Sequence, residues 1–91
     1  MAILVELFGI PRARAGVEKI SVLEDHDAAT LGEVLDELGR LLPAVAESCL
    51  DQSRLRSGFI ASIDGHIFSR DTDVVVKKGQ SVLVLSADAG G

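Results

Sequence analysis

The sequence is poor in the residues from which cysteine-based and aromatic binding sites are built. Of its 91 residues one is a cysteine, three are phenylalanines and none is a tryptophan or a tyrosine. A single cysteine excludes an intramolecular disulfide and a metal site made of cysteines, and few aromatic rings are present to stack on nucleic-acid bases. The sequence has neither an apolar run near the roughly 20 residues that span a bilayer nor a basic leader before an apolar stretch. We therefore expect a soluble, cytoplasmic protein.

Basic residues are also scarce. Nine lysines and arginines stand against 14 acidic residues, and the resulting net charge of -5 repels the phosphates of nucleic acids. The hydrophobic fraction of 47% and the charged fraction of 25% are ordinary for a globular chain. A chain of this length builds one hydrophobic core. We expect one domain, residues 1–87, and a mobile tail, residues 88–91, with nothing to pack.

The first part of the chain predicts two strands. Residues 2–10 are apolar at nearly every position and are bounded by glycine and proline, and residues 17–23 alternate between apolar and polar. Between them we expect a loop that carries Arg12 and Arg14. The two strands and this basic connection predict an N-terminal hairpin.

A helix follows, with its start marked by a capping box. Thr30 and Glu33 have the spacing at which each side chain bonds the backbone N–H of the other residue. Leucine and valine then recur at helical spacing, which predicts an amphipathic helix over residues 31–42. Pro43 ends it and can begin a short second helix through residues 44–50.

The second half of the chain predicts three more strands. Residues 58–63 form the first, Asp64-Gly65 a tight turn, residues 66–68 a short return strand, and residues 81–87 a strongly apolar last strand. This order indicates an α+β fold with one main helix on one face of a sheet. We expect the first and last strands to lie side by side at the sheet centre. The opposite face then has no covering element, and exposed apolar patches commonly mark docking surfaces.

The chain ends in its only pair of adjacent glycines, Gly90-Gly91. A linker remnant or plain composition would also produce such a pair. The interpretation therefore depends on the residues that precede it.

The whole chain resembles the MoaD and ThiS families of sulfur carriers, most closely MoaD, the small subunit of molybdopterin synthase. Four stretches carry the resemblance: Leu7-Phe8-Gly9 with Arg12, Arg14 and Gly16; Thr30-Leu31 with Val34, Leu35 and Leu38; Ile63-Asp64-Gly65; and residues 73–79 with Val82 and Val84. Two departures stand out. Gln80 replaces the acidic residue usual after the turn glycine, and residues 86–89 lack the prolines typical before the glycine pair of MoaD.

The resemblance implies a β-grasp (ubiquitin-like) fold with a mixed four- to five-stranded sheet, and a carrier rather than an enzyme. It implies that a partner of the ubiquitin-activating type uses ATP to join Gly91 to AMP. Sulfide or a persulfide then displaces AMP and leaves a thiocarboxylate, which donates its sulfur to an acceptor such as the molybdopterin synthase large subunit. The chain itself would bind no cofactor. Gly90 and Gly91 lack Cβ atoms, so they can thread a narrow channel.

Other functions remain open. The sulfur could go to thiamine, cysteine or tRNA instead of molybdopterin. Gly91 could be joined to lysines of other proteins, which would make the chain a protein modifier, since adenylation serves both purposes. A β-grasp interaction module without C-terminal chemistry is the third class.

The remaining polar residues favour structural or solvated roles. His26 and His66 are far apart and lie in predicted loops, so we expect surface histidines and no metal site. Cys49 falls in an apolar helical stretch and is expected to be buried and inert. Arg12 and Arg14 are most simply solvated, although they could pair with acidic residues of a partner. An acidic loop is likewise expected to be solvated or to meet a basic rim on a partner: Glu24, Asp25 and Asp27.

Overall fold

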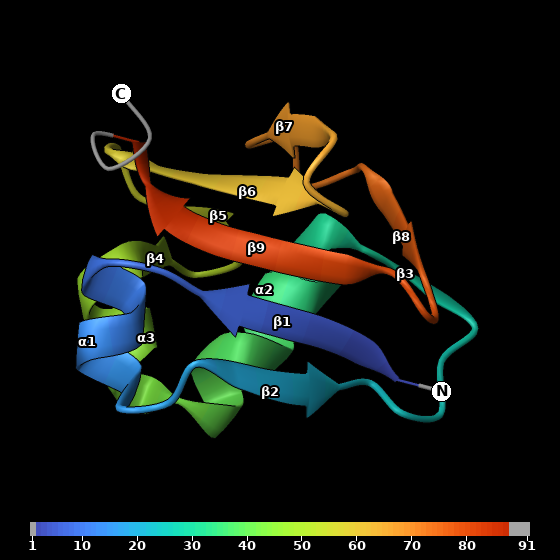
Figure 1. Ribbon diagram of the computed structural model, residues 1–91, viewed down its shortest axis with the longest axis horizontal. Coiled ribbons are helices and arrows are strands. Elements are labelled where there is room, and N and C mark those ends of the chain that lie inside the picture. The colour runs from blue at the N-terminus through green and yellow to red at the C-terminus, as the bar shows by residue number, and fades with distance from the viewer. Residues whose placement is uncertain (1, 88–91) are drawn as a thin grey trace.

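The chain folds as a five-stranded sheet with helices packed on one face (Figure 1). The computed structural model describes residues 2–87. The two central strands, β1 (Ile3–Leu7) and β9 (Ser81–Ser86), pair in parallel, and β2 (Lys19–Val22) lies antiparallel to β1. On the other side β6 (Phe59–Ile63) lies antiparallel to β9, and β7 (Ile67–Ser69) to β6. The order β2-β1-β9-β6-β7 confirms the predicted mixed sheet with the first and last strands at its centre.

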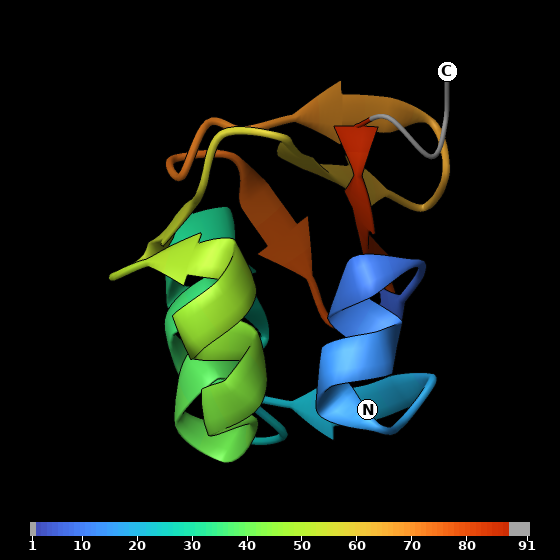
Figure 2. The same cartoon turned by 90° about the vertical axis from the view of Figure 1, so that its left-hand side faces the viewer.

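Two helices in sequence cover one face of this sheet. The capping box that opens α2 (Leu31–Leu41) is present: the Glu33 N–H donates to Thr30 Oγ1 at 3.1 Å, and the Thr30 N–H donates to Glu33 Oε1 at 2.9 Å. Pro43 begins α3 (Pro43–Cys49), as predicted. In Figure 2 these helices form one layer and the sheet another.

The core lies between the sheet and α2. In β1 and β9 every second residue faces the helix layer and is buried, which is the period of two expected for strands with one covered face. Each large apolar side chain buried there contributes about 1.5–3 kcal/mol. The fully or almost fully buried residues of these three elements are Ile3, Val5, Leu7, Leu31, Val34, Leu35, Leu38, Val82 and Val84.

A helix, α1 (Ile10–Ala15), stands where the sequence predicts a loop. Gly9, with a φ of 63°, turns the chain out of β1, and Pro11 is tolerated because the first turn of a helix needs no N–H donor from it. Gly16 ends the helix in a left-handed conformation, and its N–H donates to the Arg12 carbonyl at 3.0 Å. The predicted strand over residues 2–10 therefore ends at Leu7, and the strand expected from residue 17 begins at Lys19.

Two short ribbons, which the sequence does not predict, complete the described fold. β3 (Ala28–Thr30) pairs with β8 (Val75–Lys77), and β4 (Leu50–Asp51) pairs with β5 (Arg54–Leu55), both antiparallel. Within residues 2–87 no helix is long and apolar enough to cross a membrane.

The turn that leads from β6 to β7 is joined to the turn that leads into β9. Asp64 (φ 53°) and Gly65 (φ 76°) form the predicted tight turn. The Asp64 carboxylate accepts hydrogen bonds from the Ser81 N–H at 2.8 Å and from Gln80 Nε2 at 3.1 Å. Gln80 Oε1 in turn accepts from the Lys77 N–H at 2.8 Å. These bonds fix the start of β9, the strand that leads to the C-terminus.

Candidate functional site

The chain leaves the core through the central strand β9. This strand is hydrogen-bonded to β1 on one side and to β6 on the other, and beyond it the Ala87 N–H donates to the Gly58 carbonyl at 2.7 Å. The predicted reactive residue Gly91 and its neighbour Gly90 lie outside the described residues. The structure therefore describes where the tail is attached: at the end of a strand held on both sides.

The sheet face turned away from the helices, toward the viewer in Figure 1, is not covered by any element of residues 2–87. We call it the open face. The strand register places ten outward residues on it or beside it: Leu4, Glu6, Phe8, Lys19, Ser21, Ile60, Ser62, Phe68, Leu83 and Leu85.

One row of residues runs across all five strands of the open face. Register pairs Lys19 with Glu6, Glu6 with Leu83, Leu83 with Ser62, and Ser62 with Phe68. The row is charged at the β2 end and apolar at the β7 end. Ser62 is fully buried within it, and its Oγ has no hydrogen-bond partner among the described residues.

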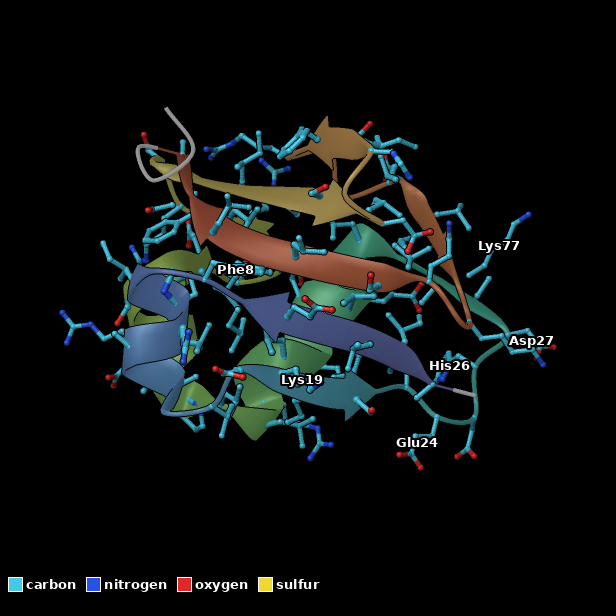
Figure 3. All side chains as sticks on the ribbon, viewed as in Figure 1. Phe8, Lys19, Glu24, His26, Asp27 and Lys77 are labelled. Carbon is cyan, nitrogen blue, oxygen red and sulfur yellow. The ribbon has the colours of Figure 1, made fainter. Side chains whose placement is uncertain are left out.

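Two phenylalanines stand out from the open face. Phe68 is 60% exposed on β7, and Phe8 is 42% exposed just after β1. The Phe8 N–H donates to the Val84 carbonyl at 3.0 Å, so Phe8 lies beside the end of β9, near the point where the tail begins. Figure 3 shows Phe8 and Lys19 on the viewer's side of the sheet. Phe8 and Phe68 lie on either side of the half-buried Leu83 and Leu85 of β9. Together these apolar side chains form a surface suited to docking another protein.

Sequence reasoning inferred this face but not its residues. The sequence showed Leu83 and Leu85 as part of a strand that is apolar on both faces. Such a strand is either buried on both faces or has one apolar face that no element of the fold covers. Phe68 was not recognisable, because a three-residue strand carries no periodicity. Its place on the face follows only from its pairing with Ser62.

The two arginines predicted for the first loop lie instead on α1. Arg12 forms an ion pair with Glu18, and both side chains are more than half exposed. Arg14 is exposed as well. The prediction that these side chains are solvated is confirmed.

The histidines and the cysteine also lie where they were expected. His26 and His66 are exposed and belong to separate loops, before β3 and before β7. Among the described residues no three histidine, cysteine, aspartate or glutamate side chains are grouped as a metal site would require. Cys49 is buried, and this burial raises the pKa of its thiol, so the nucleophilic thiolate is disfavoured.

The carboxyl groups with a clear pKa shift have structural roles. The Thr30 N–H lowers the pKa of Glu33, and the Ser81 N–H lowers the pKa of Asp64. The Arg40 side chain lowers the pKa of Glu37 through a hydrogen bond. Each of these groups caps a helix, fixes a turn or pairs along a helix, and none faces another titratable group in a cavity as a general acid or base would.

Comparison with known proteins agrees with this geometry. The model of the ThiS family matches residues 5–91. A search of curated proteins finds no match. The fold is similar to the crystal structure of SAMP1 from Haloferax volcanii (21% identity, TM-score 0.80, all of both chains). It is also similar to a chain of the Amycolatopsis orientalis BexX/CysO complex (20% identity, TM-score 0.76, 99% of this chain and 100% of that one). The solution structure of the Haloferax volcanii HVO 2177 protein matches as well (24% identity, TM-score 0.71, 100% of this chain and 87% of that one).

Proposed function

The chain belongs to the ThiS family of ubiquitin-like β-grasp proteins, and from this premise we propose that it carries sulfur on the C-terminal carboxylate of Gly91. One observation supports the proposal above the others. The central strand β9 is paired with β1 as far as Val84 and with β6 as far as Ser86, and the Ala87 N–H, four residues before the chain ends, donates to the Gly58 carbonyl; Leu83 and Leu85 of this strand lie on the open face. A rigid domain with an uncovered apolar face presents its terminus to a partner in a defined orientation.

The proposed chemistry occurs at the terminus and not at a side chain. A carboxylate is a poor electrophile, since its charge is delocalised and it has no leaving group. A partner adenylating enzyme joins Gly91 to AMP at the expense of ATP, and sulfide then displaces AMP to leave a thiocarboxylate. Four extended residues span at most about 14 Å, so the tail reaches a nucleotide at the end of a short channel. Any side chain at Gly91 would obstruct that channel.

Molybdopterin is the acceptor pathway that we propose, with the molybdopterin synthase large subunit as the partner that receives the sulfur. The support is the resemblance of the chain to MoaD, carried by Leu7-Phe8-Gly9 and Ile63-Asp64-Gly65. Thiamine synthesis, cysteine synthesis and tRNA thiolation use the same thiocarboxylate chemistry. Adding the thiocarboxylated chain to the large subunit and the molybdopterin precursor distinguishes them, because only the first pathway then forms molybdopterin.

The intact mass of the untagged protein from its native cells tests the carrier proposal. We expect a species that is heavier by the exchange of one oxygen for one sulfur, and fragmentation should localise the exchange to Gly91. A chain that stays a free carboxylate with a sulfur source, ATP and the cognate adenylating enzyme would overturn the proposal. Removal of Gly90-Gly91 without loss of function would favour an interaction module instead.

A protein modifier is the second candidate. It is favoured by the fold similarity to the small archaeal modifier protein 1 of Haloferax volcanii. In this case Gly91 forms an isopeptide bond with a lysine of a target protein. Digestion of native lysate followed by mass spectrometry should then find lysines that carry the C-terminal residues of this chain. If no such modified lysines are found and the thiocarboxylate is present, sulfur carriage is the function and protein modification is excluded.

A further inference from the structure

The arginines are distributed unevenly, although the chain as a whole is acidic. Four of the six lie on α1, which packs against β9, or close to the Gly58–Phe59 segment that pairs with the end of β9, and we call this region the arginine end. These residues are Arg12, Arg14, Arg56 and Arg70. Of the other two, Arg54 is paired by register with Asp51, and Arg40 lies on α2 and pairs with Glu37.

Hydrogen bonds connect the arginine end to the start of the tail. The Arg70 guanidinium donates to the carbonyls of Phe59, at 2.8 Å, and Leu55, at 3.0 Å. Between these two residues the chain turns at Arg56 and Gly58, and Gly58 is the residue that accepts the Ala87 N–H. Arg56 is therefore two residues from the backbone group that holds the last described residue of the chain.

Arg14 approaches the same region from α1. Arg14 and Arg56 both lie close enough to Cys49 for their charges to oppose the rise in the pKa of its thiol. Both side chains are exposed, and neither forms an ion pair with another described residue. Two unpaired cations thus lie near Cys49 at the end of α3, one on α1, which packs on α3, and one whose N–H donates to the Cys49 carbonyl at 2.8 Å.

The opposite end of the molecule has the opposite character. Figure 3 shows Glu24, His26, Asp27 and Lys77 together, far from the end of β9. There Lys78 is neutralised by Asp27, with 2.9 Å between its amine and the carboxylate. The acidic residues Glu24, Asp25 and Asp27 outnumber Lys77 and Lys78 at that end, whereas the arginine end holds the exposed and unpaired Arg14 and Arg56.

We propose that the arginine end docks against carboxylate side chains at the mouth of the tail channel in the adenylating enzyme. This inference rests on the proposed function, since it names the chemistry of the partner's surface. Arginines are suited to the role because the planar guanidinium bonds a carboxylate through two parallel hydrogen bonds. An acidic chain is repelled by nucleic acid, so a protein partner fits better. The arginines act in docking and not at the reacting carbonyl of Gly91, which lies four residues beyond Ala87.

The test compares Arg14→Glu/Arg56→Glu with the wild type and with Arg40→Glu as the matched control. The chain is the substrate in ATP–pyrophosphate exchange by the adenylating enzyme purified from the native cells. We expect the double variant to raise KM about tenfold at low salt, with kcat unchanged, because two attractive charge pairs become repulsive. Arg40→Glu should stay within about twofold of the wild type, since an exposed charge outside an interface contributes little.

Salt provides a second readout that a merely structural role would not change. Raising the ionic strength from about 0.01 to about 0.15 M shortens the screening length from about 30 to about 8 Å. The wild-type KM should rise across this range, and the gap between the wild type and the double variant should narrow. Thermal melting should find both variants folded, because the substituted side chains are exposed.

Three results would overturn the inference alone: an unchanged KM in the double variant, an equal loss in Arg40→Glu, or a wild-type KM that does not depend on salt. Tighter binding of the wild type to tRNA than to the enzyme at about 0.15 M salt would assign the arginine end to nucleic acid instead. If the wild type supports no exchange at all, the proposed function fails, and the inference fails with it.

Discussion

Phe68 offers a sharp test of the open face as a docking surface. Its side chain is 60% exposed, so it contributes little to the core, yet it stands at the apolar end of the row that crosses the five strands. We expect Phe68→Ala to weaken docking to the adenylating enzyme and to leave the fold almost unchanged. The change removes a side chain whose large exposed area has no evident structural purpose.

The magnitude follows from the exposed area. A phenylalanine buries roughly 200 Å² when it is fully covered, so the 60% that is exposed corresponds to roughly 120 Å². At about 25 cal/mol per Å² its coverage by a partner contributes about 3 kcal/mol at most. Alanine retains the β-carbon, and we therefore expect a loss of about 2 kcal/mol, or about a thirtyfold rise in KM.

The assay is ATP–pyrophosphate exchange, with Val75→Ala as the control. Val75 is 57% exposed, nearly as much as Phe68, but it lies on the ribbon of β3 and β8, outside the open face. Its substitution should change KM by less than about twofold, as is usual for surface positions. Equal effects of the two substitutions on KM, or a KM effect of Phe68→Ala that only follows a lowered melting temperature, would refute the docking role.

Three further predictions concern the scaffold. Thr30→Ala should lower the free energy of unfolding by about 1 kcal/mol in urea denaturation, and Thr30→Ser should restore most of it; an equal loss in both would exclude the capping role. Gln80→Glu replaces the Nε2–H donor to Asp64 by a second carboxylate and should lower the melting temperature at neutral pH. The pKa of Asp64 is lowered, chiefly by the Ser81 N–H. The stabilisation that the Asp64 carboxylate gives the fold is therefore present above its unfolded pKa of about 3.9 and is lost as the pH falls through its folded pKa. The difference in melting temperature between Gln80→Glu and the wild type should shrink in acid, and a difference that does not depend on pH would show that repulsion between the introduced carboxylate and that of Asp64 is not its cause. The Cys49 thiol is buried and should react with a disulfide reagent far more slowly in the folded chain than in urea, whereas equal rates would contradict its burial.

Much of the fold could be predicted because its signals are local. The capping box of Thr30 and Glu33, the Asp64-Gly65 turn and the apolar runs of β1 and β9 are each readable within a few residues. α1 was missed because six residues are too few for a helical period and because Pro11 ordinarily marks the end of an element. β3 with β8, and β4 with β5, were missed because strands of two or three residues exist only through their pairing.

The candidate site divides in the same way. Gly90-Gly91 was found from its place in the sequence, and its role stays a prediction, since both residues lie outside the described part of the chain. The open face was inferred from the count of helices against the sheet, whereas Phe68 and Ser62 required the strand register. The sequence showed Gln80 only as a departure from the MoaD pattern, whereas in the structure it bridges Lys77 and Asp64 and fixes the start of β9.

The sequence by itself determined the α+β fold, the central position of its first and last strands, and the terminus proposed to carry the chemistry. The first two follow from hydrophobic periodicity, capping and turn residues, which act over short stretches of chain. The terminus follows from the position of Gly90-Gly91 and from the resemblance to the MoaD and ThiS families. Only the tertiary structure decided which side chains share a surface. Glu6, Leu83 and Phe68 are remote in sequence and lie in one row because strand pairing sets the register. Arg14 and Arg56 both lie near Cys49 because α1 packs on α3 and the turn after β5 lies beside the end of α3. Such neighbours depend on long-range packing, which no short stretch of sequence encodes.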